Sequence, residues 1–359
     1  MSDFIIYLMT VFAVVAALDR IFGNRLGLGQ EFENGIMAFG TLALSMLGII
    51  SLAPVLASLL RPVIVPVFRL FGADPGMFPG AILACDMGGA SLSMELAESR
   101  EAGLFGGTVV GSMLGVTIVF TIPVALGIIA SEDRKCLAQG VLAGIITIPV
   151  GSLVGGLVAG FPFLMVCQNL IPVVLFALLI ALGLWKAERA MIKGFTVFGW
   201  IVTAVITVGL VSALVETLTG LVIIPGMAPL SEGFEVVGNI ALILAGAFPL
   251  VYTVTKVFRK PLMKLGGLLG MNDVAAAGMV ATLANSIPMF GMLKDMDKRG
   301  KVLNVAFAVS AAFVFGDHLG FTAGFAPEML VPMIVGKLVS GITAVAVAML
   351  LIRKKDRVS

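Results

Sequence analysis

Apolar residues run along almost the whole chain in long stretches, which short polar or charged connections separate. A membrane-spanning helix needs about 20 consecutive, mostly apolar residues. Nine stretches meet this requirement, and we expect each of them to cross a membrane as one helix. They cover residues 4–21, 34–60, 103–130, 136–161, 163–185, 195–218, 236–258, 303–321 and 329–352.

Two further apolar stretches are interrupted near their middle by small and hydrogen-bonding residues. Residues 72–101 contain Cys85-Asp86-Met87-Gly88-Gly89-Ala90-Ser91, and residues 270–300 contain Leu283-Ala284-Asn285-Ser286-Ile287-Pro288. Non-helical backbone at membrane depth is tolerated only where protein or a water-filled cavity covers it. We therefore expect two re-entrant hairpins whose tips meet at a substrate site. In the alternative arrangement both segments cross the membrane fully, which would give eleven spans.

An internal repeat relates the two halves of the chain. At an offset near 199 residues, Arg61-Pro62 corresponds to Lys260-Pro261. At an offset of 185, Val150-Gly151-Ser152-Leu153-Val154-Gly155-Gly156 matches Val335-Gly336-Lys337-Leu338-Val339-Ser340-Gly341 at five of seven positions. We divide the chain accordingly into a first transmembrane repeat (1–161, hairpin near 72–101), a linking span (162–194) and a second repeat (195–359, hairpin near 270–300).

The placement of basic residues distinguishes the two arrangements. With eleven full spans, lysines and arginines would be shared evenly between the two sides of the membrane. With two hairpins, only Arg61, Arg69 and Arg100 remain on one side, Lys337 lies within a span, and the other basic residues gather opposite. Positive charge marks the cytoplasmic side. The chain is then expected to have its N-terminus outside, its C-terminus in the cytoplasm, and two halves of opposite orientation. Such inverted repeats are typical of secondary transporters.

Composition agrees with an all-α polytopic membrane protein. Of 359 residues, 59% are hydrophobic and 12% are charged, whereas about a quarter are charged in soluble domains. The net charge of +2 does not indicate a nucleic-acid partner. The cysteines, Cys85, Cys136 and Cys167, lack the spacing of metal ligands. We expect no cofactor, no metal and no enzymatic activity.

Regularly spaced glycines indicate close helix packing rather than a ligand site. Gly103, Gly107, Gly111 and Gly115 recur every four residues and so share one helical face. Gly151 and Gly155 have the same spacing and receive the same interpretation.

Asp86 is the first candidate for chemistry. An ionised carboxylate near the bilayer centre costs about 2.5–3.5 kcal/mol on insertion scales, so it should face protein or water. It could compensate the charge of a cationic substrate or coupling ion. It could instead cap the half-helix that follows the tip, where the helix dipole is positive. Its counterpart in the second repeat, Asn285, is neutral.

A second set of candidates lies near the end of the chain. Asp317 precedes His318, the single histidine, which could titrate near neutral pH or form a local hydrogen-bonded pair with that aspartate. Lys337 lies inside the last span, where a lysine either pairs with a carboxylate (Asp317 or Asp86) or extends to the surface.

Several of these stretches resemble one known family, the ethanolamine permeases of ethanolamine-utilization operons (EutH). The resemblance covers nearly the whole chain, although residues 160–163 and 220–234 are shorter than in the family. It is carried by Leu83-Ala84-Cys85-Asp86-Met87-Gly88-Gly89, by Met279-Val280-Ala281-Thr282-Leu283-Ala284-Asn285, by Gly316-Asp317-His318-Leu319-Gly320-Phe321 and by Pro332-Met333-Ile334-Val335-Gly336-Lys337-Leu338. It implies ethanolamine uptake across a bacterial cytoplasmic (inner) membrane.

The candidate residues suit such a substrate. Ethanolamine is mostly an ammonium ion at neutral pH and carries one hydroxyl group. A site for it needs a carboxylate, a few neutral acceptors and an aromatic wall. Asp86 could bind the ammonium, and Asp317 could hold a coupling proton or neutralise Lys337. The candidates near the hydroxyl are Asn285 with Ser286 or Ser91, and those for the wall are Phe290, Phe313 and Phe315.

Other functions are less well supported by the sequence. A facilitative channel for ethanolamine or another small amine would lack alternating access. A membrane-embedded enzyme acting on lipid headgroups would need a polar catalytic cluster at the interface, which the sequence does not indicate. The expected partners are the amine and membrane lipid, with homo-oligomer formation left open.

Overall fold

The computed structural model describes the backbone of residues 2–356, and the side chains of these residues except at 2, 188, 258–260, 262, 265 and 353–356. Every regular element in this range is a helix. The elements up to residue 158 are α1 (Ser2–Ile21), α2 (Leu28–Leu70), α3 (Met77–Ile82), η1 (Cys85–Met87), α4 (Gly89–Leu96), α5 (Arg100–Leu104), η2 (Phe105–Gly115), η3 (Thr117–Thr121), α6 (Ile122–Ile128), η4 (Ser131–Asp133) and α7 (Arg134–Val158). Those that follow are α8 (Phe163–Lys186), α9 (Glu188–Thr219), α10 (Leu230–Leu268), α11 (Asp273–Ala284), α12 (Ser286–Met292), η5 (Leu293–Asp295), α13 (Lys298–Ala311), α14 (Asp317–Phe325), η6 (Pro327–Met329) and α15 (Leu330–Asp356).

The prediction of an all-α polytopic membrane protein is confirmed. Within the described residues, eight helical stretches are long and apolar enough to cross a membrane. One of them, Arg100–Ile128, joins α5, η2, η3 and α6 without a break, and the others are α1, α2, α8, α9, α10, α15 and the stretch Ser131–Val158 that contains α7.

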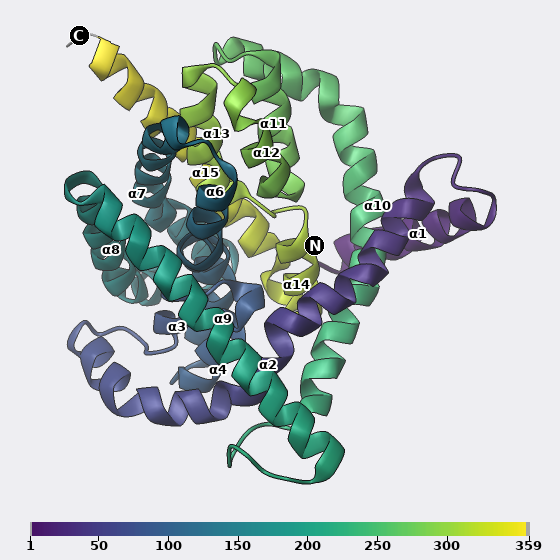
Figure 1. Cartoon of the computed structure of the whole chain (residues 1–359), viewed down its shortest axis with the longest axis vertical. Coiled ribbons are helices and arrows are strands. Elements are labelled where there is room, and N and C mark those ends of the chain that lie inside the picture. The colour runs from purple at the N-terminus through teal and green to yellow at the C-terminus, as the bar shows by residue number, and fades with distance from the viewer. Residues whose placement is uncertain (1, 357–359) are drawn as a thin grey trace.

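The long helices form two groups (Figure 1). In the first, α2 packs along α10, while α1 lies against α10 and α9 lies against α2. In the second, α7 packs against α15, α13 and α8. The interrupted segments and α14 lie between the groups, where they contact helices of both.

The two longest helices exceed the spans expected from the sequence. Helix α2 has 43 residues and α10 has 39, against the predicted ranges 34–60 and 236–258. Prolines do not end them, since Pro54 and Pro62 lie inside α2 and Pro249 lies inside α10. A proline removes one backbone hydrogen bond and bends a helix, and α10 is visibly curved in Figure 1.

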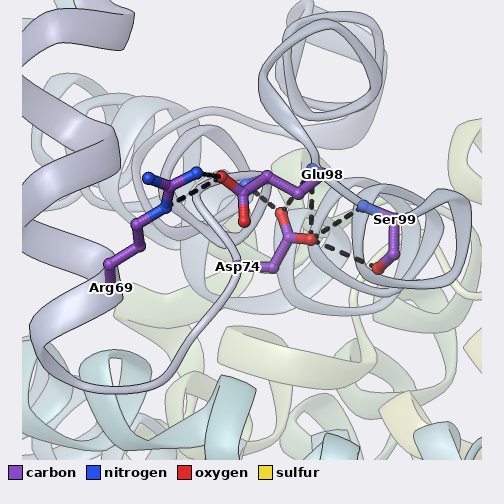
Figure 2. A network of polar contacts seen from close by, with 5 residues as sticks. Arg69, Asp74, Glu98 and Ser99 are labelled. Atoms are coloured by element: carbon purple, nitrogen blue, oxygen red, sulfur yellow. Dashed lines mark hydrogen bonds and ion pairs between the residues drawn. The ribbon is translucent and has the colours of Figure 1, made fainter.

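The first interrupted segment folds back on itself. It consists of α3, the short turn η1 and α4, and Gly88 between η1 and α4 has a positive φ of 87°. The Asp74 carboxylate accepts hydrogen bonds from the backbone N–H groups of Gly76 (2.8 Å), Glu98 (3.1 Å) and Ser99 (2.9 Å). Figure 2 shows this network, in which Glu98 also pairs with Arg69 at 2.6 Å. The beginning and the end of this segment therefore lie next to each other.

The second interrupted segment closes in the same way. It consists of α11 and α12, which Asn285 separates in extended conformation. At its ends, the backbone N–H of Asn272 donates to the Asp297 carboxylate (2.9 Å), and its side chain donates to the carbonyl of Asp295 (3.0 Å).

A single span over residues 303–321 was expected, and this expectation is wrong. Helix α13 ends at Ala311 and α14 begins at Asp317. Between them, the N–H groups of Phe313 and Phe315 donate to the carbonyls of Thr282 (3.2 Å) and Leu283 (2.9 Å). The helix can break here because carbonyl groups near the tip of the second interrupted segment accept hydrogen bonds from the N–H groups of residues 313 and 315. A sequence pattern of apolar residues cannot reveal such a partner.

The regularly spaced glycines Gly103, Gly107, Gly111 and Gly115 pack against the first interrupted segment. Every residue from 105 to 115 is buried, and this stretch has the wide π-helical form. A Cβ atom at Gly107 would lie 2.6 Å from the Cα of Ala90, and one at Gly115 would lie 1.9 Å from the Leu83 carbonyl oxygen. The interpretation of these glycines as packing positions is therefore confirmed at Gly107 and Gly115.

Helices α7 and α15 approach closely at another glycine pair, which gives a test of the packing. A Cβ atom at Gly151 would lie 2.4 Å from the Gly336 carbonyl oxygen. We expect Gly151→Ala to lower the free energy of unfolding by about 1–3 kcal/mol, because the two backbones must separate. Thermal unfolding of the purified protein in detergent measures the change.

Gly238→Ala is the matched control, since a Cβ atom there meets nothing within 4 Å. Alanine favours a helix over glycine by about 1 kcal/mol, so this variant should be at least as stable as the wild type. Equal stability of the two variants would contradict close packing at Gly151.

Candidate functional site

Three ionisable side chains from three separate segments meet inside the protein. His318 lies at the start of α14, Lys337 in α15 and Asp86 in η1. The Lys337 Nζ lies 3.1 Å from the His318 Nδ1, and the His318 Nε2 lies 3.9 Å from an Asp86 carboxylate oxygen. We call these three residues the Asp86–His318–Lys337 cluster.

Burial differs along the cluster. Lys337 is fully buried, the His318 side chain is 1% exposed, and the Asp86 side chain is 18% exposed. Asp86 is therefore the least buried member of the cluster. The cluster is an ordered arrangement of a cation, an imidazole and an accessible carboxylate.

Breaks in the helices place these side chains. Asp86 lies in the turn η1 between extended Ala84 and left-handed Gly88. A Cβ atom at Gly88 would lie 2.2 Å from the Ile49 side chain, so glycine lets this turn press against α2. His318 is the second residue of α14, directly after the break at 312–316, which turns the chain toward the first hairpin.

Lys337 takes neither of the two roles considered from the sequence. It does not extend to the surface, and among the residues that the structure describes no carboxylate lies within ion-pair distance of its Nζ. Instead the ammonium donates a hydrogen bond to the backbone carbonyl of Ser112 in η2 and contacts His318. The imidazole thus stands between Lys337 and Asp86.

Asp86 does not cap the following helix. Helix α4 has Gly88 as its N-cap, and no side chain caps it. A second carboxylate, Asp317, is half-buried and directly precedes His318 in the chain. Of the two roles considered for Asp86 from the sequence, capping is thus excluded.

Aromatic rings border the cluster on one side. The Phe313 ring lies 5.3 Å from the His318 ring and 5.6 Å from the Phe120 ring, between centroids. Phe313 has a positive φ of 63°, an unfavourable conformation for a bulky residue. Phe315 is half-buried, and Phe290 is 1% exposed within the hydrophobic core.

Of the remaining candidates, Asn285 and Ser286 lie at the second tip and Ser91 lies in the first interrupted segment. The Asn285 side chain accepts from the Ile287 N–H at 2.8 Å and so caps α12. The Ser286 hydroxyl is buried without a hydrogen-bond partner in the described structure, and Ser91 is half-buried in α4. None of these three is recorded in hydrogen-bond contact with the Asp86–His318–Lys337 cluster among the described residues.

Cys85 belongs to the site but was not singled out from the sequence. Its Sγ lies within 4.8 Å of ligand atoms of Asp86 and His318, a grouping that could hold a metal ion. The contact with Lys337 argues against a metal ion. When the Lys337 ammonium donates to the His318 Nδ1, the proton of the neutral ring lies on Nε2, and a protonated Nε2 facing Asp86 cannot bind a metal ion. The signal in the sequence was the position of Cys85 beside Asp86.

These features place the chain among multi-pass membrane proteins with ionisable groups held at broken helices, which often mark a transport pathway. Comparison with known proteins then gives the family. The family model described as "Ethanolamine utilisation protein, EutH" matches residues 1–351. The chain belongs to this family.

Curated relatives agree with this assignment. A protein of Listeria monocytogenes named "Probable ethanolamine permease EutH" is 65% identical over 346 residues, which are 96% of this chain and 93% of that protein. One of the same name from Escherichia coli is 50% identical over 393 aligned residues, covering 99% and 96% of the two chains. The "Uncharacterized protein YxeR" of Bacillus subtilis is 50% identical over 347 residues, 97% of this chain and 94% of that protein. No solved structure matches the chain.

Proposed function

We propose that this protein takes up ethanolamine across the bacterial cytoplasmic membrane by alternating access, and that the Asp86 carboxylate binds the ammonium group. Family membership and the permease names of its relatives support the substrate. The observation that carries the binding role is the accessible carboxylate of Asp86 at the end of an otherwise buried cluster.

The electrostatics of the cluster suit a cationic substrate. Among the described residues no lysine or arginine lies within ion-pair distance of Asp86, and His318 stands between it and Lys337. An ammonium ion at Asp86 would supply three N–H donors to a carboxylate that accepts only. Asp317 adds a second carboxylate nearby, which could hold a coupling proton or balance the charge of Lys337. The Phe313 ring supplies an apolar wall beside His318.

Helix lengths support re-entrant hairpins. Helices α3 and α4 have 6 and 8 residues, and α11 and α12 have 12 and 7. At 1.5 Å per residue the longest of them reaches about 18 Å, whereas the hydrocarbon core is about 30 Å thick. The hydrogen-bonded ends at Asp74 and Asn272 are what a segment that enters and leaves on one side requires.

Reciprocal contacts support a pseudo-two-fold relation between the repeats. Gly151 and Gly336 are equivalent in the repeat, and a Cβ atom on either one would approach the other's carbonyl oxygen, at 2.4 and 2.9 Å. Likewise α1 lies on α10 while α9 lies on α2. Such exchange of partners, i with j and j with i, is the signature of a two-fold axis.

Two ion pairs also join equivalent positions of the two proposed repeats. Arg100, directly after the first hairpin, pairs with Glu328 before α15 at 2.6 Å. Lys301, directly after the second hairpin, pairs with Asp133 before α7 at 2.5 Å. In the proposed topology the first pair faces outside and the second faces the cytoplasm. The outer pair is more exposed than the inner one.

This arrangement keeps the expected division into repeats of 1–161 and 195–359 with α8 as the linking span, although residues 357–359 lie outside the described part of the chain. It also keeps the N-terminus outside. Alternating access, rather than a facilitative channel, is favoured because inverted repeats with broken helices are typical of secondary transporters.

Uptake by purified protein in liposomes tests the role of Asp86. We expect Asp86→Asn to reduce uptake of labelled ethanolamine by about 10–100-fold, the loss of one charged hydrogen bond, while the protein stays folded. Asp295→Asn serves as the control, because this exposed aspartate lies at the base of the second hairpin. Wild-type uptake by Asp86→Asn would remove Asp86 as the binding carboxylate.

Cysteine labelling tests the hairpins. In a background without Cys85, Cys136 and Cys167, we expect cysteines at exposed Glu101 and Lys298 to react with an impermeant thiol reagent from opposite sides of the membrane. Eleven full spans would place both positions on the same side, so labelling from one side would overturn the hairpin arrangement.

A further inference from the structure

We propose that His318 recognises the hydroxyl group of the substrate, and that Lys337 enables this by fixing the tautomer of the His318 ring. The inference rests on the proposed function, because it assumes that Asp86 binds the ammonium group. It concerns a different part of the substrate, however, and can fail separately.

Lys337 determines which ring nitrogen carries the proton. A lysine ammonium has three N–H donors and no acceptor. Its recorded partners are the Ser112 carbonyl, which can only accept, and the His318 Nδ1 at 3.1 Å. For both contacts to be hydrogen bonds, Nδ1 must accept as well. The proton of the neutral ring then lies on Nε2.

A carboxylate close to Lys337 offsets part of the cost of burying its ammonium group. The Asp86 carboxylate attracts it across the imidazole, and Asp317 is the other carboxylate beside the cluster. The thiol of Cys85 also faces Lys337. A fully buried cation without a negative group nearby would be strongly unfavourable. With Lys337 as an ammonium ion, its contact with Nδ1 leaves the ring donor on Nε2.

The Nε2–H then points toward Asp86 without bonding to it. The 3.9 Å between Nε2 and the carboxylate oxygen exceeds a hydrogen-bond length, so the two groups can bond to separate atoms of one guest. Ethanolamine carries its hydroxyl two carbons from the ammonium nitrogen. With the ammonium on Asp86, the hydroxyl oxygen can accept from Nε2–H.

The ring is held for this role. Phe313 packs against His318, which is 1% exposed, so the imidazole cannot turn freely to exchange its two nitrogens. An amine without a hydroxyl, such as ethylamine, would leave Nε2–H without a partner. A site built to bond a substrate hydroxyl discriminates against the analogue that lacks it.

Nitrogen NMR tests the tautomer directly, because His318 is the single histidine of the chain. In protein labelled with ¹⁵N-histidine, we expect Nε2 to be protonated and Nδ1 to be unprotonated at neutral pH. Ethanolamine should shift the Nε2 resonance, and ethylamine should not. A proton on Nδ1, or equal shifts with both amines, would overturn the proposal without any variant having to fold.

Competition binding tests the selectivity. We expect the wild type to prefer ethanolamine over ethylamine by about 10–100-fold, and His318→Phe to bring this ratio near one, since phenylalanine fills the space without a donor. Lys337→Met, which keeps the length but not the charge, should lower the ratio and change the tautomer. His318→Gln, which retains an N–H donor, should keep part of the preference.

Lys294→Met is the control, because it removes an exposed lysine. If wild-type protein does not bind ethanolamine at all, the proposed function is wrong. If ethanolamine binds and His318→Phe keeps the wild-type ratio, the proposed function stands and the role of His318 is excluded.

Discussion

A lysine ammonium with no access to solvent is the constraint on which the centre of this protein depends. Lys337 must find partners inside the protein, since an unpaired charge there would cost several kcal/mol. Its partners come from η2 and α14, and the imidazole leads on to Asp86 in η1. One cation thereby holds four segments in a fixed relation.

Close backbone approach makes this convergence possible. The first hairpin can press on η2 only because glycines leave room, as at Gly107 and Gly115, where a Cβ atom would meet backbone of the hairpin. Gly316 does the same for α14, where a Cβ atom would lie 2.0 Å from the Ala284 carbonyl oxygen. In a lipid environment, small residues at interfaces let van der Waals packing replace the hydrophobic driving force. Packing and polar contacts therefore support one another.

The two interrupted segments share one scheme of closure. Each interrupted segment is closed at its base by an aspartate that accepts from backbone N–H groups, Asp74 in one half and Asp297 in the other. Their tips are chemically different, however, because Asp86 remains available to a solute while Asn285 caps its own helix. The two segments thus share their closure at the base and differ at the tip.

The sequence by itself determined the membrane class, eight of the nine predicted long helices, the two interruptions and the presence of Asp86, His318 and Lys337 within apolar stretches. Those features are local, because they depend on hydrophobic length and on residues that interrupt it. Only the tertiary structure decided that 303–321 breaks at Phe313, that Lys337 contacts His318 instead of a carboxylate, and that Cys85 joins the site. Each of these depends on a partner more than 15 positions away, such as Thr282 for Phe313 or Ser112 for Lys337. The spacing of residues along one helix cannot predict such a distant partner.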